Sequence, residues 1–115
     1  MRTILLTIAL LFPTIAQSGE REESARLAIE YGGVAEYMLF DRTRVDILTN
    51  TYAIEVEYPA KWAEAVGQSL YYAAVTNRKP AIIFLVTGQD DNRFVYRAMV
   101  AGNKFGITVF IEVVE

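Results

Sequence analysis

Apolar and polar residues after residue 18 alternate between helix-like and strand-like segments. Residues 19–31 are rich in charged residues and alanine and end at Gly32 and Gly33, which predicts a helix that stops there. Three segments of strand character follow at 34–40, 43–48 and 52–58, separated by polar turns at 41–42 and 49–51. Strands joined by such short turns pair with their neighbours, so the pattern predicts an antiparallel meander.

The second half of the chain changes to alternating helices and strands. Pro59 occupies the favoured first position of a helix that we expect to run to about Thr76. Residues 80–87 form a continuous apolar run, typical of a strand buried on both faces. The run 90–92 (Asp-Asp-Asn) offers an N-cap for a helix ending near 102–103, and 107–114 reads as a last strand. The whole order predicts one α/β domain over residues 19–115.

The first 18 residues have the three regions of a secretory signal peptide. Arg2 supplies a positive charge, residues 4–12 are mostly apolar, and the small-x-small end is Ala16-Gln17-Ser18. The apolar stretch is short for a membrane span. We therefore predict an exported protein, periplasmic or secreted, with no stable membrane span after cleavage; the alternative is a cytosolic protein whose first element is buried.

Composition excludes several kinds of chemistry. The 115 residues contain no cysteine and no histidine, and 11 basic against 14 acidic side chains give a net charge of −3. A disulfide framework, a zinc finger, a Ser-His-Asp triad and a histidine base are all impossible. Any catalysis must use carboxylates, Lys, Tyr, Ser or Thr, or a metal held by oxygen ligands.

The hairpin at residues 49–51 brings acidic residues together. A two-residue turn at Asn50-Thr51 places Asp46 opposite Glu55, and Glu57 then shares their face. The opposite face carries Val45, Ile47, Ile54 and Val56, which we expect to form the core. Opposed carboxylates repel one another unless they gain a cation, a proton or good solvation, and Mg²⁺ prefers such oxygen ligands.

A solvated sheet face is the competing interpretation of these carboxylates. The same register places Arg44 opposite Glu57, where the two would form an ordinary surface ion pair. The next helix favours a site instead, because Gln68 and Tyr72 each fall within about 20° of Lys61 around its axis. A polar stripe on a half-exposed helix explains the same spacing.

Together these residues resemble the PD-(D/E)XK nuclease superfamily, whose restriction-endonuclease-like core is a helix, a three-stranded meander, a helix and a strand. The resemblance covers about residues 20–87, and the last helix and strand extend it. The two acids of the family motif correspond to Asp46 and Glu55. The segment Gln68-Ser69-Leu70-Tyr71-Tyr72 is similar to the QxxxY motif of the RecB-like branch.

The resemblance implies a Mg²⁺- or Mn²⁺-dependent nuclease. Asp46 and Glu55 would hold the metal, and Gln68 and Tyr72 would contact substrate or orient the carboxylates. The chain departs from the motif at two positions: Val45 replaces the proline before the first acid, and Glu57 replaces the lysine. The alternatives are a site that works with Glu57, a site in which Lys61 supplies the lysine, and a degenerate site. An additional ligand could come from the first helix, which carries Glu20, Glu23 and Glu30.

Three function hypotheses follow. The first is a small exported nuclease acting on nucleic acid, with DNA favoured over RNA. The second is a catalytically inactive domain of the same fold that acts as a binding module, and the third is an exported structural protein. The negative net charge opposes phosphate binding, although a local basic patch is conceivable from Arg78, Lys79, Arg93, Arg97 and Lys104. Because the domain is small, a homodimer would give a larger binding footprint.

Overall fold

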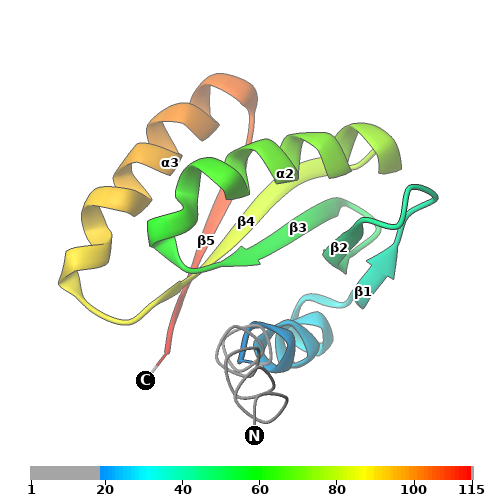
Figure 1. Cartoon of the computed structure of the whole chain (residues 1–115), viewed down its shortest axis with the longest axis horizontal. Helices are drawn as coiled ribbons and strands as arrows, with labels where there is room; N and C mark the ends of the chain where they lie inside the picture. The colour runs from blue at the N-terminus through cyan, green and yellow to red at the C-terminus, as the bar shows by residue number, and fades with distance from the viewer. Residues whose placement is uncertain (1–18, 115) are drawn as a thin grey trace, which may run out of the picture.

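The computed structural model describes residues 19–114, which form helices packed on a five-stranded mixed sheet. The strand order is β1-β2-β3-β4-β5, with β1, β2 and β3 antiparallel and β3, β4 and β5 parallel (Figure 1). The strands are β1 (Val34–Met38), β2 (Arg44–Leu48), β3 (Tyr52–Glu57), β4 (Lys79–Val86) and β5 (Thr108–Val113). The predicted α/β class, the meander and the order of the elements are therefore confirmed.

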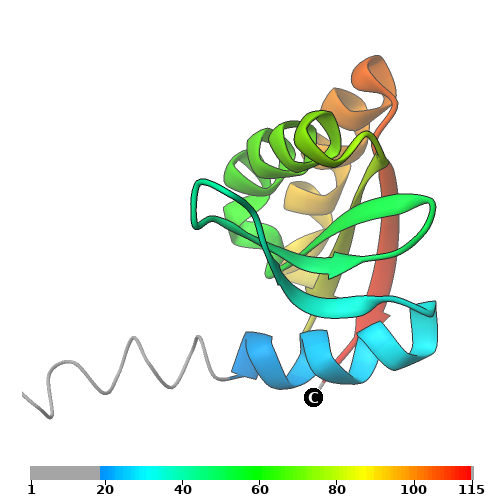
Figure 2. The ribbon, with the colours of Figure 1, turned by 90° about the vertical axis from the view of Figure 1, so that its right-hand side faces the viewer.

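Helices cover both faces of the sheet and make a three-layer domain. The helix at residues 19–31, here called the N-terminal helix, lies on one face, and α2 (Trp62–Thr76) and α3 (Asn92–Phe105) lie on the other (Figure 2). Leu27 and Ala28 pack with Ile54 and Ile83 on the first side. The second side is built around Phe84, which packs with apolar residues of α2 and α3. Burying apolar side chains on both faces of the central strands supplies the main stabilising force.

The helix boundaries agree with the predicted ones to within about three residues at each end. The helix α2 ends at Asn77, which has a left-handed φ of 55°, and α3 runs on to Phe105 before Gly106 with φ 72°. Pro59 begins a 3₁₀ turn, Pro59–Lys61, and not α2 itself. The cap of α3 lies within the predicted run 90–92, but it makes no capping hydrogen bond through its side chain. Asp91 occupies the cap position, but its carboxylate accepts the Thr87 N–H at 2.9 Å and caps no helix N–H.

The register of β2 and β3 is the one that the two-residue turn predicts. Ile47 pairs with Ile54 and Leu48 with Ala53. Beyond these pairs the backbone ladder stops, and the Val56 N–H donates to the Asp46 carboxylate instead, at 2.8 Å. Where the backbone pairing ends, β2 is therefore held to β3 through the Asp46 side chain.

One predicted core position faces the other way. Ile47, Ile54 and Val56 pack against the N-terminal helix, as expected for one face. Val45 is fully buried but packs with Tyr72 of α2 and not with Ile47, so its assignment to their face is wrong. Beside this position, Glu36 of β1 has a left-handed φ of 56°, so the β1–β2 pairing is also irregular next to Asp46.

The signal-peptide prediction falls on residues 1–18, which lie outside the described residues. Within residues 19–114, no helix is long and apolar enough to cross a membrane.

Candidate active site

A concave, polar pocket of about 370 Å³ opens beside β3 and the first half of α2. Figure 1 shows α2 lying over β3 and β4, and residues of both β3 and α2 line the pocket. The N-terminal helix contributes from its first turn. The pocket is lined by Glu20, Arg44, Asp46, Glu55, Val56, Glu57, Lys61, Glu64, Gln68 and Tyr72.

The structure thus brings every predicted site residue to one cavity. Asp46 comes from β2, Glu55 and Glu57 come from β3, and Lys61 precedes α2. Residue alternation places Glu55 and Glu57 on the face of β3 that lies toward α2, because Ile54 and Val56 occupy the other face. A single strand therefore serves the core with one face and the pocket with the other.

Two carboxylates of this pocket, those of Glu55 and Glu57, are buried, which is unusual for acidic side chains, and Asp46 is half-buried. Glu55 is only 5% exposed and Glu57 only 6%. The side chains of Asp46 and Glu55 lie close enough for a hydrogen bond between carboxyl groups, and those of Glu57 and Glu20 do so as well. Two carboxyl groups can form such a bond only when they share a proton.

Backbone N–H groups donate hydrogen bonds to two of these carboxyl groups. The Val56 N–H donates to Asp46 Oδ2 at 2.8 Å, and the Tyr58 N–H donates to Glu57 Oε1 at 2.9 Å. Glu55 has no such support, because its Oε1 is buried and lacks any hydrogen-bond partner among the described residues. A buried, unpartnered carboxylate oxygen is costly, so this atom has the strongest need for a proton or a cation.

Burial makes all three carboxyl groups weak acids. Desolvation raises the pKa of Asp46 to about 7, against the opposing effect of the Val56 N–H. Desolvation first, and then the charge of Asp46, raise the pKa of Glu55 to about 10. Desolvation also raises the pKa of Glu57 to about 7, although Lys61 and the Tyr58 N–H both act to lower it. Groups of this kind gain most from a positive charge.

The geometry does not match the solvated-face interpretation. That interpretation expects Arg44 to neutralise Glu57 on an open surface. The ion pairs of residues 19–114 do not include one between Arg44 and Glu57, and Glu57 is buried in a cavity. The carboxylates are therefore closer together and less exposed to solvent than the solvated-face interpretation expects.

Among the acids of the N-terminal helix, only Glu20 reaches the pocket. Glu23 and Glu30 instead form ion pairs with Arg26 at 2.6 and 3.6 Å. The sequence could not select among these three, because the choice depends on how the helix packs across the sheet. Glu64 of α2 also lines the pocket and was not among the predicted site residues. The signal that could have found Glu64 is its position on the helix, about 60° around the axis from Lys61.

Gln68 and Tyr72 enter the pocket from one face of α2, as their spacing predicts. Tyr72 is 7% exposed, and burial, followed by the charges of Glu55 and Asp46, raises its pKa to about 12. It therefore remains a neutral hydrogen-bond donor at physiological pH. The neighbouring Tyr71 points elsewhere and donates to the Asp41 carboxylate, which ties α2 to the β1–β2 turn.

The basic residues do not converge on the pocket. Only Arg44 and Lys61 line it, against five acidic side chains. Arg78 is committed to structure, because its guanidinium donates to the Thr49 and Thr76 carbonyl oxygens at 3.2 and 2.8 Å. A phosphate group would meet net negative charge here unless cations entered with it.

The donor set suits a hard divalent cation such as Mg²⁺, because it consists of carboxylate oxygens. The unpartnered Glu55 Oε1, next to Asp46, supports the same fit. In the part of the chain that the structure describes, no three Asp or Glu side chains stand in a ready metal-binding arrangement. The metal prediction therefore rests on the Asp46–Glu55 pair.

Comparisons with protein-family models, with curated proteins and with solved structures find no match to this chain.

Proposed function

We propose that this protein is a divalent-metal-dependent phosphodiesterase that hydrolyses nucleic-acid backbones, with Asp46 and Glu55 as the metal ligands. The observation that carries the proposal is the buried Glu55 carboxylate, which has an unpartnered oxygen beside Asp46 in an open cavity. The order helix, meander, helix, strand agrees with the PD-(D/E)XK resemblance on which the choice of reaction rests. DNA is the favoured substrate.

The strongly acidic pocket supports a role for metal in this proposal. Those of the five acidic side chains that are ionised repel a phosphodiester, so substrate binding needs their charge to be offset. A bound Mg²⁺ supplies this charge, stabilises negative charge on the phosphate oxygens and lowers the pKa of a coordinated water. Asp46 is positioned by the Val56 N–H, which fixes one of its oxygens and leaves the other for the metal.

Glu57 and Lys61 are the candidates for proton transfer and charge stabilisation. Glu57 has a pKa near neutrality, which suits a group that accepts a proton from water and releases it again. Lys61 lies close enough to affect the Glu57 pKa, and it would add positive charge near the phosphate. Gln68 and Tyr72 would donate hydrogen bonds to the substrate backbone or to the carboxylates.

The test combines metal titration with cleavage. Calorimetry with Mg²⁺ and Mn²⁺ is run beside cleavage of plasmid and single-stranded DNA, using the wild type and Asp46→Asn. The matched control is Glu22→Gln, an exposed acid of the N-terminal helix outside the pocket. The proposal expects binding and cleavage to be lost together in Asp46→Asn and retained in the control. Absence of binding at millimolar metal would overturn it.

The second candidate is an inactive binding module of the same fold. The observation that favours it is Glu57, which stands where the family motif has lysine and adds negative charge to an acidic pocket. Metal binding that depends on Asp46, without cleavage of any nucleic acid tested, is the outcome expected of this candidate.

A further inference from the structure

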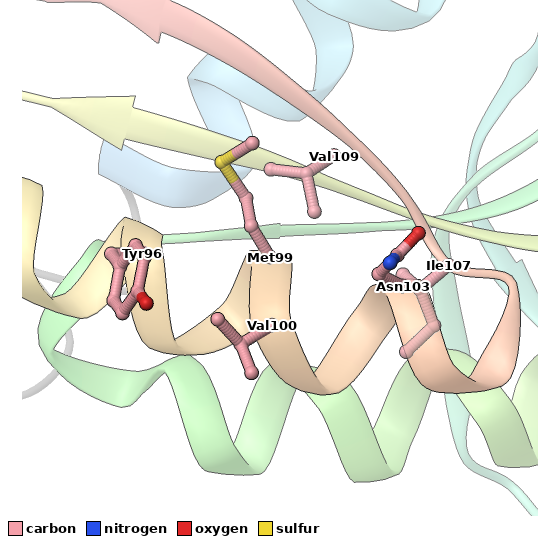
Figure 3. Close-up of a pocket in the computed structure, with 6 residues that line it drawn as sticks. All are labelled: Tyr96, Met99, Val100, Asn103, Ile107 and Val109. Atoms are coloured by element: carbon pink, nitrogen blue, oxygen red, sulfur yellow. The ribbon is translucent and has the colours of Figure 1, made fainter.

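A second surface, made by α3 and the edge strand β5, is mostly apolar, unlike the pocket that holds the carboxylates. A groove of about 370 Å³ is lined by Tyr96, Met99, Val100, Asn103, Ile107 and Val109. Figure 3 shows Met99 of α3 reaching toward Val109 of β5, with Tyr96 and Val100 on the same helix. Five of the six lining residues are apolar or aromatic, and the surface is open.

This surface is larger than the groove. Tyr96, Met99 and Val100 are 68%, 53% and 56% exposed. Ile111 and Val113 follow Val109 on the same face of β5 by alternation, and they are 45% and 80% exposed. Phe105, at the end of α3, is 61% exposed. We call the surface made by the groove and these three residues the α3/β5 face.

The two edges of the sheet differ in how they are protected. The β1 edge is interrupted at Glu36, whose left-handed backbone bends the strand, and such irregularities discourage further pairing. The β5 edge is regular, with all six residues in register with β4, and the described residues place no strand on its other side. Its single charged residue, Glu112, lies 3.6 Å from Arg26 of the N-terminal helix and does not guard the edge.

We propose that the α3/β5 face is the interface of a homodimer, in which β5 pairs antiparallel with β5 of a second copy and the two α3 helices pack together. A regular edge strand paired antiparallel with its own copy satisfies two-fold symmetry, so every contact across the interface is made twice, and residues on the axis meet their own equivalents. The free N–H and C=O groups of β5 become hydrogen-bonded, and the sheet becomes continuous across the two chains.

The area of the face fits a dimer of ordinary size. Taking full residue areas in the range of roughly 150–250 Å², the exposed fractions of Tyr96, Met99, Val100, Phe105, Ile111 and Val113 amount to roughly 550–900 Å² per copy. A stable interface needs about 800 Å² per partner. The β5 backbone and Asn103 would supply most of the remainder. This surface also exceeds the apolar patch of a typical monomer.

Charge at the ends of α3 is compatible with this arrangement. In an antiparallel helix pair, the first turn of one α3 lies near the last turn of the other. Asp90 and Asp91 precede α3, Arg93 lies in its first turn and Lys104 in its last turn, so the two ends that approach each other carry net charges of opposite sign.

The test measures the mass of the full chain in solution by light scattering and sedimentation, over about 1 to 500 µM. The variant is Val100→Glu, which alters an exposed residue and should leave the fold intact, as circular dichroism would check. The matched control is Ile29→Glu, which changes an exposed apolar residue (85%) of the N-terminal helix. We expect wild type and control to have twice the 12.9 kDa chain mass. For Val100→Glu we expect the dissociation constant of the dimer to rise at least about 100-fold.

Disulfide trapping provides the second measurement. The chain has no cysteine, so Ile111→Cys introduces a single thiol near the middle of β5. Antiparallel self-pairing brings this position within reach of its own copy, and oxidation should give a covalent dimer. Ile29→Cys should give none under the same conditions. A monomeric wild type at every concentration overturns the proposal, as does a dimer that Val100→Glu does not weaken and Ile111→Cys does not trap.

Discussion

Glu55→Gln should stabilise the metal-free protein at neutral pH, which is the reverse of the usual effect of changing a buried polar residue. Gln is nearly isosteric with the protonated Glu and can donate to Asp46 as the protonated carboxyl does. At neutral pH the folded wild type must hold a proton on Glu55 that the unfolded chain would release, and this lowers its free energy of unfolding. Glutamine has no such proton to hold, so the variant avoids this loss of stability. A residue retained for stability alone would show the opposite effect.

The magnitude follows from proton linkage. Glu55 has an ordinary pKa of 4.5 and a folded pKa of about 10, so between these values the folded state holds a proton that the unfolded state has lost. Stability is therefore fully present below pH 4.5 and declines as pH rises, by about 1.4 kcal/mol per pH unit for this group. At pH 7 the accumulated loss reaches about 3 kcal/mol. Allowing for burial of the amide, we expect Glu55→Gln to gain about 1–3 kcal/mol.

The assay is urea unfolding in the presence of a chelator between pH 4 and pH 8, followed by the fluorescence of Trp62, the single tryptophan. The gain should vanish near pH 4, where both proteins carry an uncharged side chain. Adding Mg²⁺ should stabilise the wild type by about 2.7 kcal/mol at one hundred times the dissociation constant and leave Glu55→Gln unchanged. The exposed Glu22→Gln should match the wild type throughout.

The reasoning would be refuted if Glu55→Gln were less stable than the wild type at pH 7 without metal. An unchanged dependence of stability on pH would refute it as well, because Glu55 would then ionise as readily in the folded as in the unfolded chain.

Three further predictions test other parts of the structure. Mg²⁺ affinity should rise with pH between 6 and 8, because the proposed ligands Asp46 and Glu55 have pKa values of about 7 and about 10 and must lose protons to bind a cation; calorimetry in buffers of different ionisation enthalpy measures the protons released, and no release would contradict it. Lys61→Met should lower the rate of cleavage at least about tenfold while metal binding is retained; equal rates would remove Lys61 from the reaction. Gly33→Ala should destabilise the fold by about 1–3 kcal/mol in thermal or urea unfolding, because a Cβ there would lie 2.8 Å from both Ile47 Cγ2 and the Leu48 carbonyl oxygen; an unchanged midpoint would show that these groups move aside.

Local pattern was sufficient for much of this fold. Alternation in 52–58 and the apolar run at 80–87 located two strands to within a residue or two. The two-residue turn fixed the pairing of Ile47 with Ile54, and the 3.6-residue period placed Lys61, Gln68 and Tyr72 on one side of the helix segment. These features depend on residues close in the chain, so short-range geometry decides them.

Other features depend on contacts between distant segments. Packing of the N-terminal helix across the sheet selected Glu20 over Glu23 and Glu30. The β2–β3 backbone pairing ends at Ile47, and the neighbouring Asp46 accepts a hydrogen bond from the Val56 N–H through its side chain. Val45 packs in the cluster that contains Tyr72. No local periodicity contains this information, because it arises from how whole elements meet.

The sequence by itself determined which acids share a strand face, because successive side chains of a strand alternate and a tight hairpin has one register. Only the tertiary structure decided that these acids are buried. Desolvation depends on what covers a side chain, and α2 and the N-terminal helix, which flank the pocket, come from segments on either side of the meander. That burial turns Asp46, Glu55 and Glu57 from ordinary surface carboxylates into weak acids, which is the physical basis of the proposed site.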